Sequence, residues 1–142
     1  VGKMIEETSA GIVIFRKEET KKLFLLLHYP SGHWDFVKGK MEKEETTHET
    51  AIRETREETG ITDITFVENF EEWIEYNFKY KGELVQKKVV FFLAETKTEE
   101  IEISHEHSGY TWMDYNTAME KTTFDNAKTV LTKAQKLISD TL

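Results

Sequence analysis

The 142-residue sequence has no cysteine, a single proline and no long hydrophobic run. Without cysteine, a disulfide scaffold, a thiolate zinc site and cysteine redox chemistry are all excluded. No apolar stretch approaches the roughly 20 residues that a transmembrane helix needs. Residues 1–7 also lack the basic-then-apolar order of a signal peptide. We therefore expect a cytoplasmic protein that does not associate with membranes.

Basic residues are also scarce relative to acidic ones. The chain has 19 Lys and Arg against 27 Asp and Glu, which gives a formal net charge of -8. This charge opposes nonspecific binding to nucleic-acid phosphates and to anionic membranes, so we expect no stable nucleic-acid partner. A polyanionic small-molecule substrate would need a cation between itself and the protein.

Repeats, low-complexity tracts and proline-rich linkers are absent, which predicts a single domain over residues 1–142. Stretches rich in β-branched and aromatic residues predict two hairpins. The first pairs residues 8–15 with 23–28, and the second pairs residues 61–78 with 84–94. A brief strand is expected at residues 110–113, and helices are expected at residues 45–59, 114–121 and 125–138. Because helices with an apolar face need a flat surface to cover, we expect an α/β (α+β) fold with a mixed β-sheet between helices.

The helix over residues 45–59 has signals at both ends. Thr46 and Glu49 have the spacing of a capping box, and Gly60 stands where a C-terminal cap glycine belongs. In the last helix, Asp125 is a plausible N-cap.

The first of these helices also carries three glutamates on one face. Glu57 and Glu58 follow Glu54 by three and four residues, and such like-charge pairs cost about 0.2–0.5 kcal/mol each when they have no partner. A hard cation, Mg²⁺ or Mn²⁺, would reverse this cost and could bridge the carboxylates to substrate phosphates. Arg53, four residues from both Glu49 and Glu57, can hold a carboxylate in place. The alternative is a solvated, glutamate-rich helix face.

A longer pattern surrounds these glutamates. The sequence resembles the Nudix box, G-x5-E-x7-R-E-U-x-E-E-x-G-U, over residues 39–61, with every fixed letter present at Gly39, Glu45, Arg53, Glu54, Glu57, Glu58 and Gly60. One aliphatic position departs from the pattern, because it holds Thr55. We expect Thr55 to face the core with its hydroxyl bonded to the carbonyl of Ala51.

The resemblance to Nudix hydrolases implies the Nudix fold and hydrolysis of a nucleoside diphosphate linked to another group. It implies that Mg²⁺ or Mn²⁺ is bound by Glu54, Glu57, Glu58 and the main-chain carbonyl of Gly39. It also implies that Glu57 and Glu58 take part in catalysis and that Arg53 orients a glutamate.

Other segments resemble one branch of this family, the asymmetric diadenosine tetraphosphate (Ap4A) hydrolases. His33 to Gly39 is similar to the branch's H-W-x-x-P-K-G, with Val37 in place of proline, and Ile103 to Trp112 is similar to a segment ending E-H-x-x-Y-x-W. The run Lys88 to Glu95 resembles a strand of that branch. The resemblance implies cleavage of Ap4A to ATP and AMP. The alternatives are hydrolysis of an RNA 5'-triphosphate or another nucleoside diphosphate-linked substrate, and a noncatalytic nucleotide-binding module.

Residues outside the box are candidates for binding this substrate. Lysine side chains suit phosphate oxygens, and the candidates are Lys38, Lys87 and Lys88. Tyr76 and Tyr110 are expected to sandwich an adenine, and His33 to donate to a phosphate. Glu106 is a further metal ligand or general base.

Each of these candidates has a simpler alternative. The lysines can be solvated surface residues, the tyrosines can be core or rim residues, and His33 can be an ordinary loop histidine. The histidines on either side of Glu106 could instead indicate a transition-metal site, although successive residues of an extended chain alternate sides.

Overall fold

The structure, a computed structural model, describes residues 4–140. The strands of this part of the chain are β1 (Met4–Glu18), β2 (Lys21–His28), β3 (Trp34–Asp35), β4 (Val37–Lys40), β5 (Thr65–Phe66), β6 (Glu72–Tyr80), β7 (Glu83–Glu95) and β8 (Gly109–Met113). The helices are α1 (Thr47–Thr59), α2 (Tyr115–Lys121) and α3 (Asp125–Asp140). None of the described helices is both long enough and apolar enough to cross a membrane.

The described strands form one mixed sheet organised around β1. Over most of its length β1 runs parallel to β7, from Met4 opposite Leu84 to Phe15 opposite Glu95. On its other side, β1 pairs antiparallel with β4 through residues 9–12 and with β2 through residues 15–18. The short strand β4, which contains Gly39, is therefore held beside the centre of the sheet.

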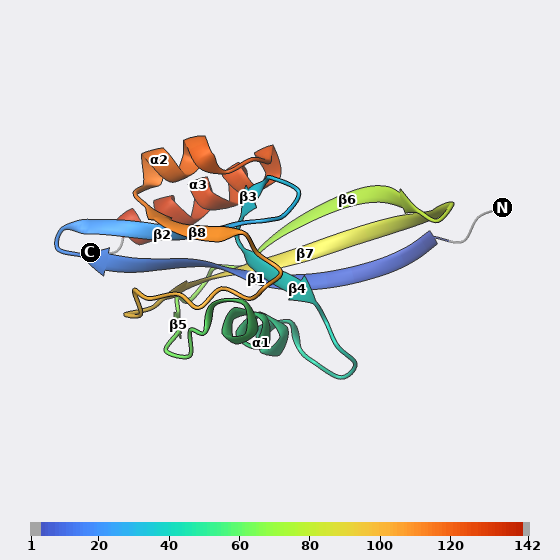
Figure 1. Cartoon of the computed structure of the whole chain (residues 1–142), viewed down its shortest axis with the longest axis horizontal. Helices are drawn as coiled ribbons and strands as arrows, with labels where there is room; N and C mark the ends of the chain where they lie inside the picture. Colours follow the sequence, from blue (N-terminus) through green and yellow to red (C-terminus); the bar gives the residue numbers. More distant parts are fainter. Residues whose placement is uncertain (1–3, 141–142) are drawn as a thin grey trace.

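Helices cover both faces of this sheet, with α1 on one face and α2 and α3 on the other (Figure 1). Successive side chains of β7 point to opposite faces of the sheet and so belong to two different hydrophobic clusters. Phe91 points into the cluster that contains Leu131 of α3, whereas Val90 points into the cluster that contains Ala51 of α1. Because this part of β7 is buried on both faces, its sequence is a nearly continuous apolar run. The predicted mixed sheet between helices is confirmed.

Helix α1 begins and ends as its sequence predicts. The Thr46 hydroxyl accepts the Glu49 N–H at 3.1 Å, and the Glu49 carboxylate accepts the Thr46 N–H at 2.9 Å. Gly60 closes the helix in the left-handed conformation, with a φ of 79°. Thr55 is fully buried, as expected, but its hydroxyl has no hydrogen-bond partner among the described residues. The predicted bond from Thr55 to Ala51 is therefore wrong.

The structure also differs from the sequence predictions at the second hairpin and at the start of the last helix. The predicted hairpin of residues 61–78 and 84–94 is present as β6 and β7, but its first strand starts only at Glu72, and β5 pairs with the other end of β7. Helix α3 already includes Asp125, and the Lys128 N–H donates to the Phe124 carbonyl at 3.0 Å. Asp125 is thus a first-turn residue and not the N-cap.

Candidate active site

The acidic residues Glu54, Glu57, Glu58 and Glu106 face a pocket of about 470 Å³ beside α1, which Glu42 also lines. The first three belong to α1, and the fourth belongs to the loop that leads into β8. Gly39 and Arg53 line the same pocket. We call it the carboxylate pocket. The structure therefore brings together the residues that the sequence assigned to the metal and to catalysis.

Arg53 fastens α1 to the chain that precedes it. Its guanidinium makes a two-point contact with Glu45, with Nε 2.6 Å from Oε2 and Nη2 3.0 Å from Oε1. It also donates to the Lys40 carbonyl at 3.0 Å and to Glu57 at 3.2 Å. Hydrogen bonding to Arg53 lowers the pKa of Glu45 to about 2, so this carboxylate stays ionised. Of the two predicted partners, Glu57 contacts Arg53, while Glu49 is used by the capping box.

Gly39 is required by the close approach of α1 to β4. A β carbon at this position would overlap the Glu54 carboxylate, and the three heavy atoms nearest to it all belong to Glu54. Because glycine has no side chain, the carboxylate rests directly against the strand backbone. A metal ligand at Glu54 is therefore placed next to the main chain of Gly39.

Glu58 is a buried acid, and one of its carboxylate oxygens has no hydrogen bond within the described part of the chain that would offset the cost of burial. Its side chain is 6% exposed, and its Oε1 lies 3.2 Å from Nε2 of His107, which is itself buried. Neither atom has a hydrogen-bond partner among residues 4–140. Burial, together with the charge of Glu54, raises the pKa of Glu58 to about 9. Burial lowers the pKa of His107, which favours the neutral imidazole.

The donor set of this pocket fits a hard divalent cation. In the described part of the chain, no group of three His, Cys, Asp or Glu side chains is arranged as it stands to hold a metal ion. Even so, the pocket offers carboxylate oxygens, and one of them, on Glu58, is buried without a partner. A cation bound here would offset both causes of the raised pKa of Glu58, which are its burial and the nearby charge of Glu54.

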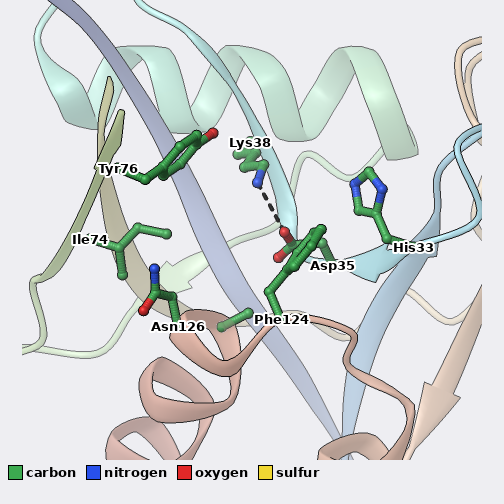
Figure 2. Close-up of a pocket in the computed structure, with 8 residues that line it drawn as sticks. His33, Asp35, Lys38, Ile74, Tyr76, Phe124 and Asn126 are labelled. Carbon is green, nitrogen blue, oxygen red and sulfur yellow. Dashed lines mark hydrogen bonds and ion pairs between the residues drawn. The ribbon is translucent and has the colours of Figure 1, made fainter. Parts of the chain in front are cut away.

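A second pocket, of about 390 Å³, lies on the α3 side of the sheet and has aromatic walls (Figure 2). Tyr76 of β6 and Phe124, the residue just before α3, line this pocket together with Ile74 and Asn126. We call it the aromatic pocket. Two rings from different elements provide apolar faces against which a flat heterocycle can stack.

Lys38 lines both pockets and so connects them. Its ammonium lies 2.9 Å from the buried Asp35 carboxylate, which holds it at the junction (Figure 2). His33 lines the aromatic pocket, where its ring stacks on Tyr29 at 4.5 Å. Burial lowers the pKa of His33. The two pockets thus share one lysine side chain.

The two neighbouring lysines of β7 point to opposite faces of the sheet. Lys87 is opposite Tyr76 in the register and shares its face. Burial, followed by the nearby charge of Lys38, lowers the pKa of Lys87. The Lys88 ammonium lies 3.0 Å from the centre of the Trp73 ring on the other face. Only Lys87 is therefore directed toward the face of the aromatic pocket.

The two tyrosines that were expected to sandwich one base are also on opposite faces. Tyr76 follows Ile74, which packs on the cluster beneath α3, whereas Tyr110 precedes Trp112, which packs on the cluster beneath α1. The aromatic partner of Tyr76 in the pocket is Phe124 instead. Nothing in the local sequence marks Phe124, because its position depends on how α3 docks against the sheet.

Three comparisons with known proteins agree with this arrangement. A model of the NUDIX domain matches residues 6–134. The chain is 34% identical to the asymmetrical bis(5'-nucleosyl)-tetraphosphatase of Mus musculus, over 94% of this chain and 96% of that protein. It is also 30% identical to the dihydroneopterin triphosphate diphosphatase of Haemophilus influenzae, over 83% of this chain and 80% of that protein. Among solved structures, a C. elegans Ap4A hydrolase binary complex aligns with a TM-score of 0.84 and 32% identity, over 94% of this chain and 98% of that chain.

Proposed function

The chain belongs to the Nudix hydrolase family, and on that basis we propose that it cleaves diadenosine tetraphosphate asymmetrically, giving ATP and AMP. The observation that carries this proposal is the sharing of Lys38 between the carboxylate pocket and the aromatic pocket. A substrate that joins a purine to a long phosphate chain can occupy both pockets at once. The similarity to a mouse enzyme named for this reaction supports the same substrate.

We assign the binding of Mg²⁺ or Mn²⁺ to the carboxylates of Glu54, Glu57 and Glu58 and to the main-chain carbonyl of Gly39. When bound, such an ion neutralises phosphate charge and lowers the pKa of a coordinated water. Arg53 keeps Glu57 in place through its 3.2 Å contact.

The proton of the attacking water needs an acceptor in the same pocket. Glu57, whose side chain is 51% exposed, and Glu106, which is exposed on its loop, are accessible to that water. Glu58 is buried against His107 and is better suited to holding the cation.

Substrate binding is assigned to the residues that line or face the aromatic pocket. Tyr76 and Phe124 would stack on one adenine, a contact worth about 1–3 kcal/mol per base. Lys38 and Lys87 would hold the phosphate chain, and His33 would donate to it. Lys88 and Tyr110 face the opposite side of the sheet and have no place in this assignment.

A second candidate substrate is a single heterocycle with a triphosphate, such as dihydroneopterin triphosphate. The Haemophilus influenzae relative is named for that activity, and a pterin also has a flat face that can stack between two aromatic rings. An RNA 5'-triphosphate is disfavoured by the net charge of -8.

A nucleotide panel tests the proposal. The protein is incubated with diadenosine tetraphosphate, dihydroneopterin triphosphate or a 5'-triphosphate RNA, each with Mg²⁺ or with excess chelator, and the products are separated by chromatography. We expect ATP and AMP in equal amounts from the dinucleotide, the highest kcat/KM for it, and no reaction in chelator. Faster pyrophosphate release from either triphosphate would transfer the assignment to that substrate. Binding of the dinucleotide without any product would indicate a noncatalytic module.

A further inference from the structure

The loop that carries Glu106 is fixed to the end of α1 by main-chain hydrogen bonds. The Glu102 N–H donates to the Thr59 carbonyl at 3.0 Å, and the Ser104 N–H donates to the Glu58 carbonyl at 3.2 Å. These bonds hold the loop beside Glu58, the helix residue that is assigned to the cation. A side chain from the loop can therefore act on the Glu58 carboxylate with fixed geometry.

His107 is the loop residue that reaches Glu58. Its side chain is 2% exposed, and its Nε2 lies 3.2 Å from the buried Oε1 of Glu58. Each of these two atoms is sealed from water and lacks any other hydrogen-bond partner among the described residues. Leaving both unpaired is unfavourable, and a small rotation of the carboxylate would satisfy both of them at once.

The orientation of the His107 ring is fixed from two sides. Its Nδ1 lies 3.2 Å from the Ser104 hydroxyl, and the edge of the ring meets Tyr29 with the centroids 4.6 Å apart. If the Ser104 hydroxyl donates to Nδ1, the proton of the neutral imidazole sits on Nε2 and points toward Glu58. The Tyr29 hydroxyl is in turn fixed to the Phe36 carbonyl at 2.7 Å.

We propose that His107, oriented by Ser104, is a positioning residue that donates from Nε2 to Oε1 of Glu58 and leaves the other carboxylate oxygen free for the divalent cation. This inference rests on the cation site proposed above and adds a residue that lies outside the Nudix box. Partners that orient a ligating carboxylate typically contribute 10- to 100-fold in metal affinity or activity.

A purely structural role of His107 predicts a different result. If the ring only fills space, every substitution that preserves volume should bind metal equally well. If it donates to Glu58, a glutamine should restore metal affinity and a leucine should not. His105 offers a matched control, because it is an exposed histidine on the same loop.

The test is Mn²⁺ binding to the free protein, followed by electron paramagnetic resonance, with thermal unfolding of each variant measured in chelator. We expect wild type and His105→Gln to bind Mn²⁺ alike, and His107→Leu to bind about 10-fold or more weakly. His107→Gln should recover most of this loss. Ser104→Ala, which removes the group that orients the ring, should weaken binding by less than His107→Leu does, and its control Ser108→Ala should leave binding unchanged.

Glu58→Gln separates the two ways in which this account can fail. If wild type and Glu58→Gln bind Mn²⁺ equally, the proposed cation site itself is wrong. If Glu58→Gln loses affinity while His107→Leu matches wild type, only the positioning role is overturned. Equal weakening of His107→Leu and His107→Gln would also overturn it, because the donor would then make no difference. Should His107→Leu not fold, wild-type affinity of Ser104→Ala would be the overturning result.

Discussion

Replacing Gly39 with alanine perturbs one side chain of the carboxylate pocket and almost nothing else. The backbone at Gly39 is not in the left-handed region, so an alanine can adopt its conformation without strain. The added β carbon would overlap the Glu54 carboxylate, while the register of β4 against β1 need not change. The substitution therefore displaces a proposed metal ligand from within the fold.

The size of this displacement follows from the contacts. The Glu54 Cγ lies 2.5 Å from the position of the new β carbon, and the carboxyl atoms are closer still, whereas ordinary contacts begin at 3.4 Å. The carboxylate must therefore withdraw by roughly an ångström or more, a misplacement that can cost about 100-fold in rate. Fold stability should change by less than about 1 kcal/mol, since alanine restricts the unfolded chain more than glycine does.

The assay is kcat/KM for diadenosine tetraphosphate over a range of Mg²⁺ concentrations, alongside thermal unfolding in chelator. We expect Gly39→Ala to lose about 100-fold in kcat/KM and to need more Mg²⁺, at a nearly unchanged melting temperature. Gly109→Ala is the matched control, because the nearest atom to its new methyl group is the His28 Cβ at 4.0 Å. Wild-type kinetics in Gly39→Ala, or a collapse of its stability, would refute the reasoning.

Three further predictions concern the substrate and the charge of the site. Tyr76→Ala and Phe124→Ala should each raise KM about 5- to 100-fold with little effect on kcat, because stacking binds ground and transition states alike; steady-state kinetics that show an unchanged KM in both would remove the assigned base site. Lys87→Met should raise KM for the dinucleotide. Lys88→Met should not, because the wild-type Lys88 ammonium lies against the Trp73 ring on the other face; a raised KM in Lys88→Met alone would contradict the assignment. Because burial raises the pKa of Glu58 to about 9, the metal-free carboxyl is protonated at pH 7 and a cation must displace that proton. Mg²⁺ affinity should therefore rise from pH 6 to pH 9, and calorimetry in buffers of different ionisation enthalpy should detect proton release; affinity independent of pH would be the contrary result.

Features encoded by neighbouring residues were predictable from the sequence. The capping box of Thr46 and Glu49 and the left-handed Gly60 set the limits of α1 by local hydrogen bonding and backbone freedom, which sequence spacing reveals directly. The same spacing placed the three helix glutamates on one face, and the structure gathers them in one pocket with Glu106. Helix periodicity alone was enough for that part of the site.

Features that depend on register or docking were not predictable in this way. Lys87 and Lys88 are adjacent in sequence, but the side-chain alternation of a strand sends them to opposite faces, and only the pairing with β1 and β6 shows which face is which. Phe124 lines the same pocket as Tyr76 because the start of α3 packs on the sheet, and this pairing of residues far apart in the chain depends on tertiary structure. The approach of His107 to Glu58 likewise requires knowing where the loop of residues 102–108 runs.

The most direct test of the proposed function is product analysis in heavy-oxygen water. Diadenosine tetraphosphate is hydrolysed with Mg²⁺ in H₂¹⁸O, and the nucleotides are identified by mass spectrometry, with Glu58→Gln run in parallel. We predict equal amounts of ATP and AMP, one ¹⁸O atom in only one of the two products, and a large loss of both products in the variant. Two molecules of ADP per substrate, or full activity of Glu58→Gln in chelator, would contradict a metal-dependent asymmetric hydrolase.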